Sequence, residues 1–208
     1  MNRRHIFLLI FMAFICLAPV NNFSGMVRFV YDGDTIILTD GQKIRYMGID
    51  APEIGHDGNE SEFMALSSLK LNRKLVSGKR VALEYDSQKT DKYGRSLAYV
   101  FLETGDMVNA ILIRKGMAHV LLTSHGLKYK DLLLEYQRKA ITEKIGIWSN
   151  QEITEHKIYS GNLNSCRFHR SNCLFGKQIN RKNLVIFKSL KDAFWEGFSP
   201  CKHCKPQV

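Results

Sequence analysis

The sequence contains no internal repeats, no low-complexity tract and no apolar run long enough for a membrane-spanning helix. The absence of repeats excludes a solenoid or a propeller-like array. Hydrophobic residues make up 45% and charged residues 24% of the 208 residues, a composition that is ordinary for a globular protein and excludes a disordered one. A chain of this length has room for one or two domains with buried cores.

The longest apolar stretch covers residues 6–20, directly after two arginines. It is shorter than the roughly 20 residues of a membrane span, and a polar stretch follows it. This layout is typical of an export signal. No cleavage site is clear, because Pro19 follows Ala18. We therefore expect residues 1–25 to be a signal peptide or an uncleaved membrane anchor, and the protein to be secreted, periplasmic or anchored at the cell surface.

Acidic residues are in the minority, and the basic excess is unevenly placed. The net charge is +10, of which residues 150–208 contribute +6. A basic balance of this size indicates an anionic partner such as nucleic acid or a membrane surface.

Hydrophobic patterns and turn residues divide the chain into short strands and helices. Three short β-runs lie within residues 26–50 and are separated by Asp-Gly pairs, a strong turn signal. Further strands are predicted at 80–85, 95–102 and 117–122, and helices within 59–79, 106–116 and 129–148. This order is typical of a five-stranded OB-fold barrel carrying three helices, so we expect a mainly β fold with α. After residue 149 the pattern changes, and we place a domain boundary between 26–149 and 150–208.

Apolar spacing also predicts which helix residues face the core. In the helix within 59–79, the residues at near-helical spacing are Phe63, Leu66, Leu69 and Leu75. In the helix at 129–148, the expected inner face consists of Leu132, Leu133, Tyr136, Ala140 and Ile147.

One short stretch concentrates groups suited to phosphate chemistry. Three carboxylates and an arginine lie close together in sequence: Asp34, Arg45, Asp50 and Glu53. A second arginine, Arg95, follows a polar loop. Carboxylate oxygens suit a hard cation such as Ca²⁺. The arginine fork matches phosphate oxygens, and a free carboxylate can take a proton from water.

Simpler interpretations of the same residues remain open at this point. Asp32 and Asp40 each precede glycine, so each is first a turn former. Strand alternation would place Arg45 and Asp50 on opposite faces of an unbroken strand. A bend at Gly48 would be needed to bring them together.

Three motifs decide between these interpretations. The segments "YDGDTI", "IRYMGIDAPE" and "DKYGR", in this order and spacing, resemble the staphylococcal nuclease (thermonuclease) family. The resemblance extends from about Met26 to Trp148 and includes the closing "GIWS". It implies a nuclease domain over residues 26–149 with a five-stranded OB barrel and three helices. It also implies Ca²⁺-dependent hydrolysis of DNA and RNA, which leaves 5′-hydroxyl and 3′-phosphate ends.

The resemblance assigns roles to single residues. The Ca²⁺ ligands are Asp34, Asp50 and, through its backbone carbonyl, Ala51. Two arginines, Arg45 and Arg95, bind phosphate, and Glu53 is the general base. Lys92 and Tyr93 match residues that contact a terminal phosphate of a bound nucleotide.

The chain departs from the family after the "GMAHV" segment. Leu122 and Ser124 stand where family members can place tyrosines that flank the bound base. Base stacking contributes roughly 1–3 kcal/mol per base, so affinity or base preference is in question while the chemistry is not. His119 and His125 are interpreted as surface or structural residues. The rival hypothesis is a catalytically silent OB-fold nucleic-acid-binding protein, which would not require all the metal carboxylates and Glu53.

The C-terminal segment carries two close pairs of potential metal ligands. His169 and Cys173 form the first pair, and Cys201 and Cys204 form the second. Two such pairs on either side of a hairpin-sized insert are typical of a tetrahedral Zn²⁺ site. A strand at 183–187 and a helix at 189–197 complete a unit too small to bury a large core, so zinc would supply the missing stability.

This segment resembles the zinc module of Ada-type DNA-repair methyltransferases, especially in "GFSPCKHC". The first ligand is cysteine there, whereas His169 stands here, and we expect a structural zinc site in a small α/β module. Cys166 is then a spare thiol or an alternative first ligand, and a disulfide framework is the competing interpretation of the cluster. His203 is expected to point to solvent. The basic residues that could hold a nucleic-acid backbone are Arg167, Arg170, Lys177, Arg181, Lys182 and Lys188.

Overall fold

The computed structural model describes residues 24–123, 126–150 and 156–206. The expected export segment lies almost entirely outside the described residues, as do Ser124 and His125. Within the described residues, no helix has both the length and the apolar character needed to cross a membrane.

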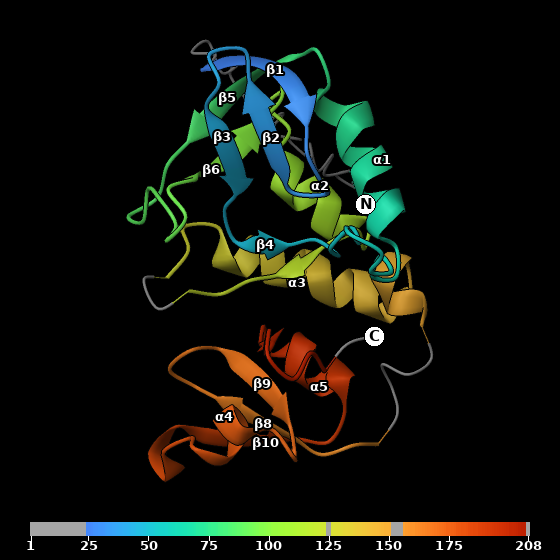
Figure 1. Ribbon diagram of the computed structural model, residues 1–208, viewed down its shortest axis with the longest axis vertical. Coiled ribbons are helices and arrows are strands. Elements are labelled where there is room, and N and C mark those ends of the chain that lie inside the picture. The colour runs from blue at the N-terminus through green and yellow to red at the C-terminus, as the bar shows by residue number, and fades with distance from the viewer. Residues whose placement is uncertain (1–23, 124–125, 151–155, 207–208) are drawn as a thin grey trace, which may run out of the picture.

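The first half of the chain closes into a five-stranded barrel with the strand order β1-β2-β3-β6-β5 (Figure 1). Strands β1, β2 and β3 form an antiparallel meander, and β6 runs parallel to β3 and antiparallel to β5. Pairing of β1 with β5 closes the barrel, and its interior is filled by side chains such as Ile36, Leu38 and Ile44. The predicted OB-fold barrel is confirmed. The strands are β1 (Gly25–Val30), β2 (Thr35–Leu38), β3 (Lys43–Tyr46), β5 (Arg80–Glu84) and β6 (Ser96–Phe101).

A break in the third β-run creates an additional short strand outside the barrel. Gly48 has a φ of 77°, a left-handed conformation that suits glycine, and the chain resumes as β4 (Ile49–Asp50). Strand β4 pairs antiparallel with β7 (His119–Val120). The predicted strand at 117–122 is therefore much shorter, and it belongs to this two-stranded sheet at the end of the barrel.

Three helices pack around the barrel: α1 (Ala65–Val76), α2 (Val108–Arg114) and α3 (Lys130–Thr142). The predicted apolar face of α1 was wrong in part, because Leu66 and Phe63 are exposed. Small polar residues face the core instead and find hydrogen-bond partners there. Ser68 donates to the carbonyl of Met117, and Asn72 accepts from the Tyr46 hydroxyl. Apolar spacing alone cannot reveal this, since the partners come from distant segments.

The third helix ends earlier than predicted. Lys144 and Gly146 have positive φ values of 52° and 61°, so α3 stops at Thr142 and the chain continues as the 3₁₀ helix η1 (Gly146–Ser149). Ile147 is buried as predicted, but it projects from η1.

The C-terminal segment folds as a small α/β module around a four-stranded sheet with the order β10-β8-β9-β11. Its strands are β8 (Tyr159–Asn162), β9 (Arg167–Arg170), β10 (Leu184–Phe187) and β11 (Ser199–Pro200). Its helices are α4 (Leu174–Lys177), η3 (Arg181–Asn183) and α5 (Leu190–Trp195). The Ser189 hydroxyl caps α5 by accepting from the Asp192 N–H. Gly197, with a φ of 81°, follows the end of the helix.

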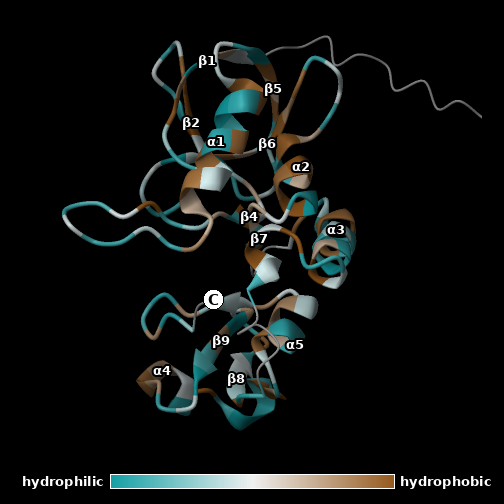
Figure 2. Cartoon of the chain, turned by 90° about the vertical axis from the view of Figure 1, so that its right-hand side faces the viewer, coloured by the Kyte–Doolittle hydropathy of each residue, from teal (hydrophilic) through white to brown (hydrophobic). Residues whose placement is uncertain are grey.

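The module packs against the end of the barrel that carries β4 and β7 (Figure 1, Figure 2). A second apolar cluster joins the two units and combines Ile141 and Trp148 with Phe168 and Phe194 of the module. The Trp148 and Phe194 rings lie edge to face, with centroids 5.0 Å apart. The sheet edge at β11 therefore faces the barrel.

Candidate active site

Arg45 lies buried between two aspartates at the end of the barrel. Its Nη1 is 2.6 Å from Oδ2 of Asp34, and its Nη2 is 2.5 Å from Oδ1 of Asp50. Nη1 also donates to the carbonyl of Ile49, at 3.1 Å. The structure thus brings together three of the residues predicted from the first motifs.

Local geometry explains how these residues converge. Asp34 directly precedes β2, and its neighbour Thr35 pairs in register with Arg45 on β3. The bend at Gly48 then returns the chain so that Asp50, on β4, reaches the same guanidinium. The bend expected at Gly48 is present. It explains how Arg45 and Asp50 meet although strand alternation would place them on opposite faces of an unbroken strand.

The "DGD" segment combines a turn with a site residue. Oδ1 of Asp32 accepts from the N–H of Asp34 at 2.9 Å, which is the local turn that Asp-Gly predicts. A Cβ at Gly33 would overlap Oγ of Ser68 and Cβ of Ala51, so the close approach of α1 requires glycine. Oδ2 of Asp34 also accepts from the N–H of Ala51, at 2.6 Å.

The site has more negative than positive groups. Burial lowers the pKa of Arg45, but the negative charges of four nearby carboxylates outweigh this effect and raise it. These carboxylates are Asp34, Asp50, Asp32 and Glu53. Burial raises the pKa of Asp34 well above its usual value despite Arg45. Burial also opposes ionisation of Asp50, but Arg45 and three other basic groups lower its pKa. Several carboxylates sharing one guanidinium fit an additional hard cation such as Ca²⁺.

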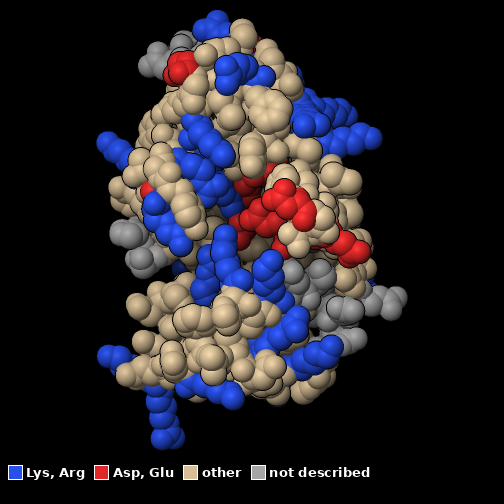
Figure 3. Space-filling model, viewed as in Figure 1, with Lys and Arg blue, Asp and Glu red and all other residues tan. Residues whose placement is uncertain are grey.

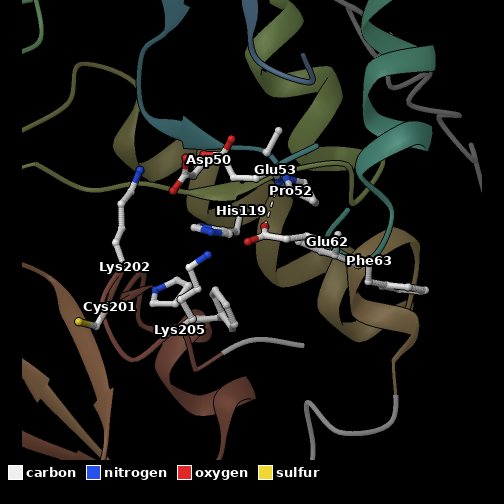
Figure 4. Close-up of a pocket in the computed structure, with 13 residues that line it drawn as sticks. Asp50, Pro52, Glu53, Glu62, Phe63, His119, Cys201, Lys202 and Lys205 are labelled. Carbon is white, nitrogen blue, oxygen red and sulfur yellow. Dashed lines mark hydrogen bonds between the residues drawn. The ribbon is translucent and has the colours of Figure 1, made fainter. Parts of the chain in front are cut away.

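A cavity of about 390 Å³ opens beside this site, between the barrel and the module (Figure 4). Asp50 and Glu53 line it from the barrel side, and the Glu53 N–H donates to the Glu62 carboxylate at 2.9 Å. Partial desolvation, together with the charge of Asp50, raises the pKa of Glu53. A carboxylate in this setting is a stronger base than a solvated glutamate.

The other predicted substrate contacts come from a single loop before β6. Nε of Arg95 is 2.6 Å from Oδ2 of Asp91, so Arg95 forms its ion pair within its own loop. Tyr93 is 72% exposed, and the ammonium of Lys92 lies 4.9 Å from its ring centroid. The structure therefore groups Lys92, Tyr93 and Arg95 on one exposed loop.

Four predicted zinc ligands meet in the module. The ligand atoms of His169, Cys173, Cys201 and Cys204 all lie within 4.8 Å of one another. Nδ1 of His169 is 3.4 Å from Sγ of Cys173. Three thiols and one imidazole at this spacing fit Zn²⁺.

No cysteine of the described residues, inside or outside this cluster, forms a disulfide. The four cysteines in the described residues are free, which excludes the disulfide framework there. Cys166 lies outside the cluster, and its thiol is 3.7 Å from the carbonyl of Leu163. His203 is exposed and has its ring edge to face against Phe175.

Three residues of the cavity were missed by sequence reasoning. His119, interpreted as surface or structural, is the register partner of Asp50 and lines the cavity. Lys202 and Lys205 line it from the module. The position of Lys202 between two zinc ligands was the one sequence feature that could have pointed to it. No local pattern, however, shows that this loop faces the cavity.

Acidic and basic side chains are clustered on the face of the molecule that carries the cavity. Figure 3 shows acidic side chains in a hollow at the centre, with Lys and Arg side chains along its borders on the barrel and on the module. Positive charge bordering a carboxylate cluster suits a polyanion that passes over this site.

Comparisons with known proteins agree with both parts of the chain. Residues 43–150 match the family model described as staphylococcal nuclease homologue, and residues 147–207 match the metal binding domain of Ada. The thermonuclease of Staphylococcus intermedius is 37% identical over 129 residues, which cover 60% of this chain and 76% of the relative. The thermonuclease of Staphylococcus hyicus is 34% identical over 137 residues, with 64% and 80% covered. Endonuclease YncB of Bacillus subtilis is 32% identical over 135 residues, with 62% and 64% covered.

Proposed function

We propose that this chain is exported and depends on Ca²⁺ for cleavage of DNA, RNA or both. The chain belongs to the staphylococcal nuclease homologue family and is a phosphodiester-hydrolysing nuclease. The observation that carries the proposal is the buried Arg45 between Asp34 and Asp50 at the edge of an open cavity. A binding protein would gain nothing from burying two carboxylates on one arginine, since this arrangement carries a desolvation cost.

The roles of the residues follow from their chemistry. Ca²⁺ held by Asp34, Asp50 and the carbonyl of Ala51 would offset charge on the phosphate during cleavage. The guanidinium of Arg45, which pairs with Asp50 at the wall of the cavity, provides planar donors for phosphate oxygens. Glu53, whose pKa is raised, takes a proton from the attacking water.

The exposed loop supplies the remaining contacts to the substrate. Arg95 binds a second phosphate oxygen after exchanging its pairing with Asp91 for the substrate. Lys92 and Tyr93 on the same loop contact a terminal phosphate. Since Arg95 is only partly buried, this exchange costs little.

The zinc module is proposed to have a structural metal and to assist binding. The clustered ligands of His169, Cys173, Cys201 and Cys204 support a closed site with no place for substrate. The basic residues of the module add affinity through the phosphate backbone. Domain boundaries near residues 25 and 149 complete this proposal, with residues 1–25 as export signal or anchor.

The test is digestion by the purified chain of single- and double-stranded DNA and RNA, in Ca²⁺ or in a calcium-selective chelator. Cleavage that requires Ca²⁺ is expected. Cleavage unaffected by chelation would overturn the metal assignment, and binding with no cleavage in any divalent cation would favour the silent binding protein. Detection of the chain outside the cytoplasm, with and without residues 1–25, tests export.

A further inference from the structure

Two lysines of the zinc module reach into the nuclease cavity. Lys202 and Lys205 line it opposite Asp50 and Glu53. Figure 4 shows the Lys202 side chain extending toward Asp50, and that of Lys205 extending toward His119 and Glu62. We propose that Lys202 and Lys205 form the second wall of the active site and bind a substrate phosphate next to the one that is cleaved.

The loop that carries these lysines is held in place from several directions. The N–H of Cys201 donates to the carbonyl of Phe168, and β11 pairs parallel with β9. Arg167 donates to the carbonyl of Pro200 at 3.1 Å, and Arg170 donates to the carbonyl of Lys205 at 3.0 Å. These two arginines, which are also among the residues expected to hold a nucleic-acid backbone, therefore support the loop.

Two of the four zinc ligands, Cys201 and Cys204, lie within the same loop. Lys202 is placed between Cys201 and Cys204, and Lys205 directly follows Cys204. The N–H of Lys205 also donates to the carbonyl of Cys201, at 2.9 Å. The ligand cluster therefore fixes the backbone from which both ammonium groups extend.

The module as a whole is docked next to the catalytic strands. The Ser199 hydroxyl donates to the carbonyl of Val120 at 3.0 Å, and Val120 lies on β7 beside β4, which carries Asp50. Gln137 of α3 donates to the carbonyl of Phe194 at 2.6 Å. Through these contacts the lysine loop keeps a fixed position relative to Asp50.

The two ammonium groups are available for a ligand. Among the ion pairs of the described residues, none includes Lys202 or Lys205. Both side chains are exposed within the cavity. A compact ammonium with three donors binds a phosphate as a point charge. Since Asp50 pairs with Arg45 and also lines the cavity, a strand whose scissile phosphate meets Arg45 would continue between barrel and module. This inference rests on the proposed function, because it places a second phosphate beside the cleaved one.

The test measures binding of a fluorescent single-stranded DNA oligonucleotide at several salt concentrations, in Ca²⁺. Full-length protein carrying Glu53→Gln, which prevents cleavage, is compared with the same protein also carrying Lys202→Gln and Lys205→Gln. Because both lysines bind the same phosphate, the double change removes one phosphate contact and should reduce the slope of log K against log salt by about 0.7. Affinity should fall several-fold and equally for oligonucleotides of different base composition.

Lys74→Gln with Lys79→Gln is the matched control, because both are exposed lysines of the nuclease domain and neither lines the cavity. Lys202→Arg with Lys205→Arg should restore most of the affinity. An unchanged slope in the Lys202 and Lys205 double glutamine variant, or an equal loss in the Lys74 and Lys79 control, would overturn the proposal. Tighter Ca²⁺ binding with unchanged DNA binding would also overturn it and would assign the lysines as counter-charges for Asp50.

A parallel cleavage assay separates this inference from the proposed function. The chain with Glu53 intact is assayed for Ca²⁺-dependent cleavage. If it cleaves and the double variant binds DNA like the parent, the lysine assignment alone fails. If it does not cleave, the proposed function fails first.

Discussion

The side chain of Gln137 donates a hydrogen bond to the carbonyl of Phe194 while accepting one from the N–H of Val120, each at 2.6 Å. Gln137 is fully buried, and the two backbone partners fix the orientation of its amide, because an N–H can only donate and a carbonyl can only accept. One side chain therefore ties α3 to β7 and to the zinc module. The same glutamine therefore holds β7, which pairs with β4, and the C-terminal module in place.

Replacement of Gln137 by leucine should destabilise the protein markedly. The change leaves the buried N–H of Val120 without its partner, at a cost of about 1–3 kcal/mol. It also removes one of two hydrogen bonds to the Phe194 carbonyl, which still accepts from the Gly197 N–H. We expect the free energy of unfolding in urea to fall by about 2–4 kcal/mol. Gln178→Leu, at an exposed position, is the control and should change stability little. Equal stability of both variants would mean that the junction does not contribute to folding.

Glu53→Ser should abolish turnover while binding is kept. Removal of a general base typically costs roughly 10²- to 10⁴-fold in rate. The measurement is kcat on single-stranded DNA, paired with oligonucleotide affinity in Ca²⁺. Glu60→Ser, an exposed glutamate of the following loop, should retain wild-type kcat. A Glu53→Ser enzyme within a factor of three of wild type would assign the base to another group.

Asp34→Asn should remove the response to Ca²⁺. The substitution keeps the shape of the side chain but removes one of the charges that bind a hard cation, so half-maximal activity should require roughly 100-fold more Ca²⁺. Asp40→Asn provides the control, because Asp40 is an exposed turn residue whose carboxylate accepts from Gln42. An ordinary Ca²⁺ titration of the Asp34 variant would contradict its assignment as a ligand.

Zinc should be present at about one ion per chain and should depend on the clustered cysteines. Cys204→Ser removes one thiolate from the cluster, and we expect it to lower zinc content and the thermal stability of the module. Cys166→Ser is matched in chemistry but lies outside the cluster, so it should keep its zinc. Loss of zinc in Cys166→Ser and retention in Cys204→Ser would make Cys166 the ligand.

Local signals account for much of what could be predicted. The turn at Asp32, the bend at Gly48 and the cap at Ser189 each depend on neighbours a few residues away, and each is present. The prediction was wrong for Leu66, which is exposed, because Ser68 and Asn72 of the same helix find polar partners across the core. Such partners belong to other segments and leave no periodic pattern.

The sequence by itself determined the strands of the barrel, the nuclease motifs and the two ligand pairs of the zinc cluster, since each depends on residues close together in the chain. Only the tertiary structure decided that Arg45 lies between Asp34 and Asp50, that Arg95 pairs with Asp91, and that Lys202 faces the cavity. The last of these depends on how the module docks against β7. That docking arises from a shared aromatic cluster and a few buried hydrogen bonds, which form only when segments far apart in the chain are packed together.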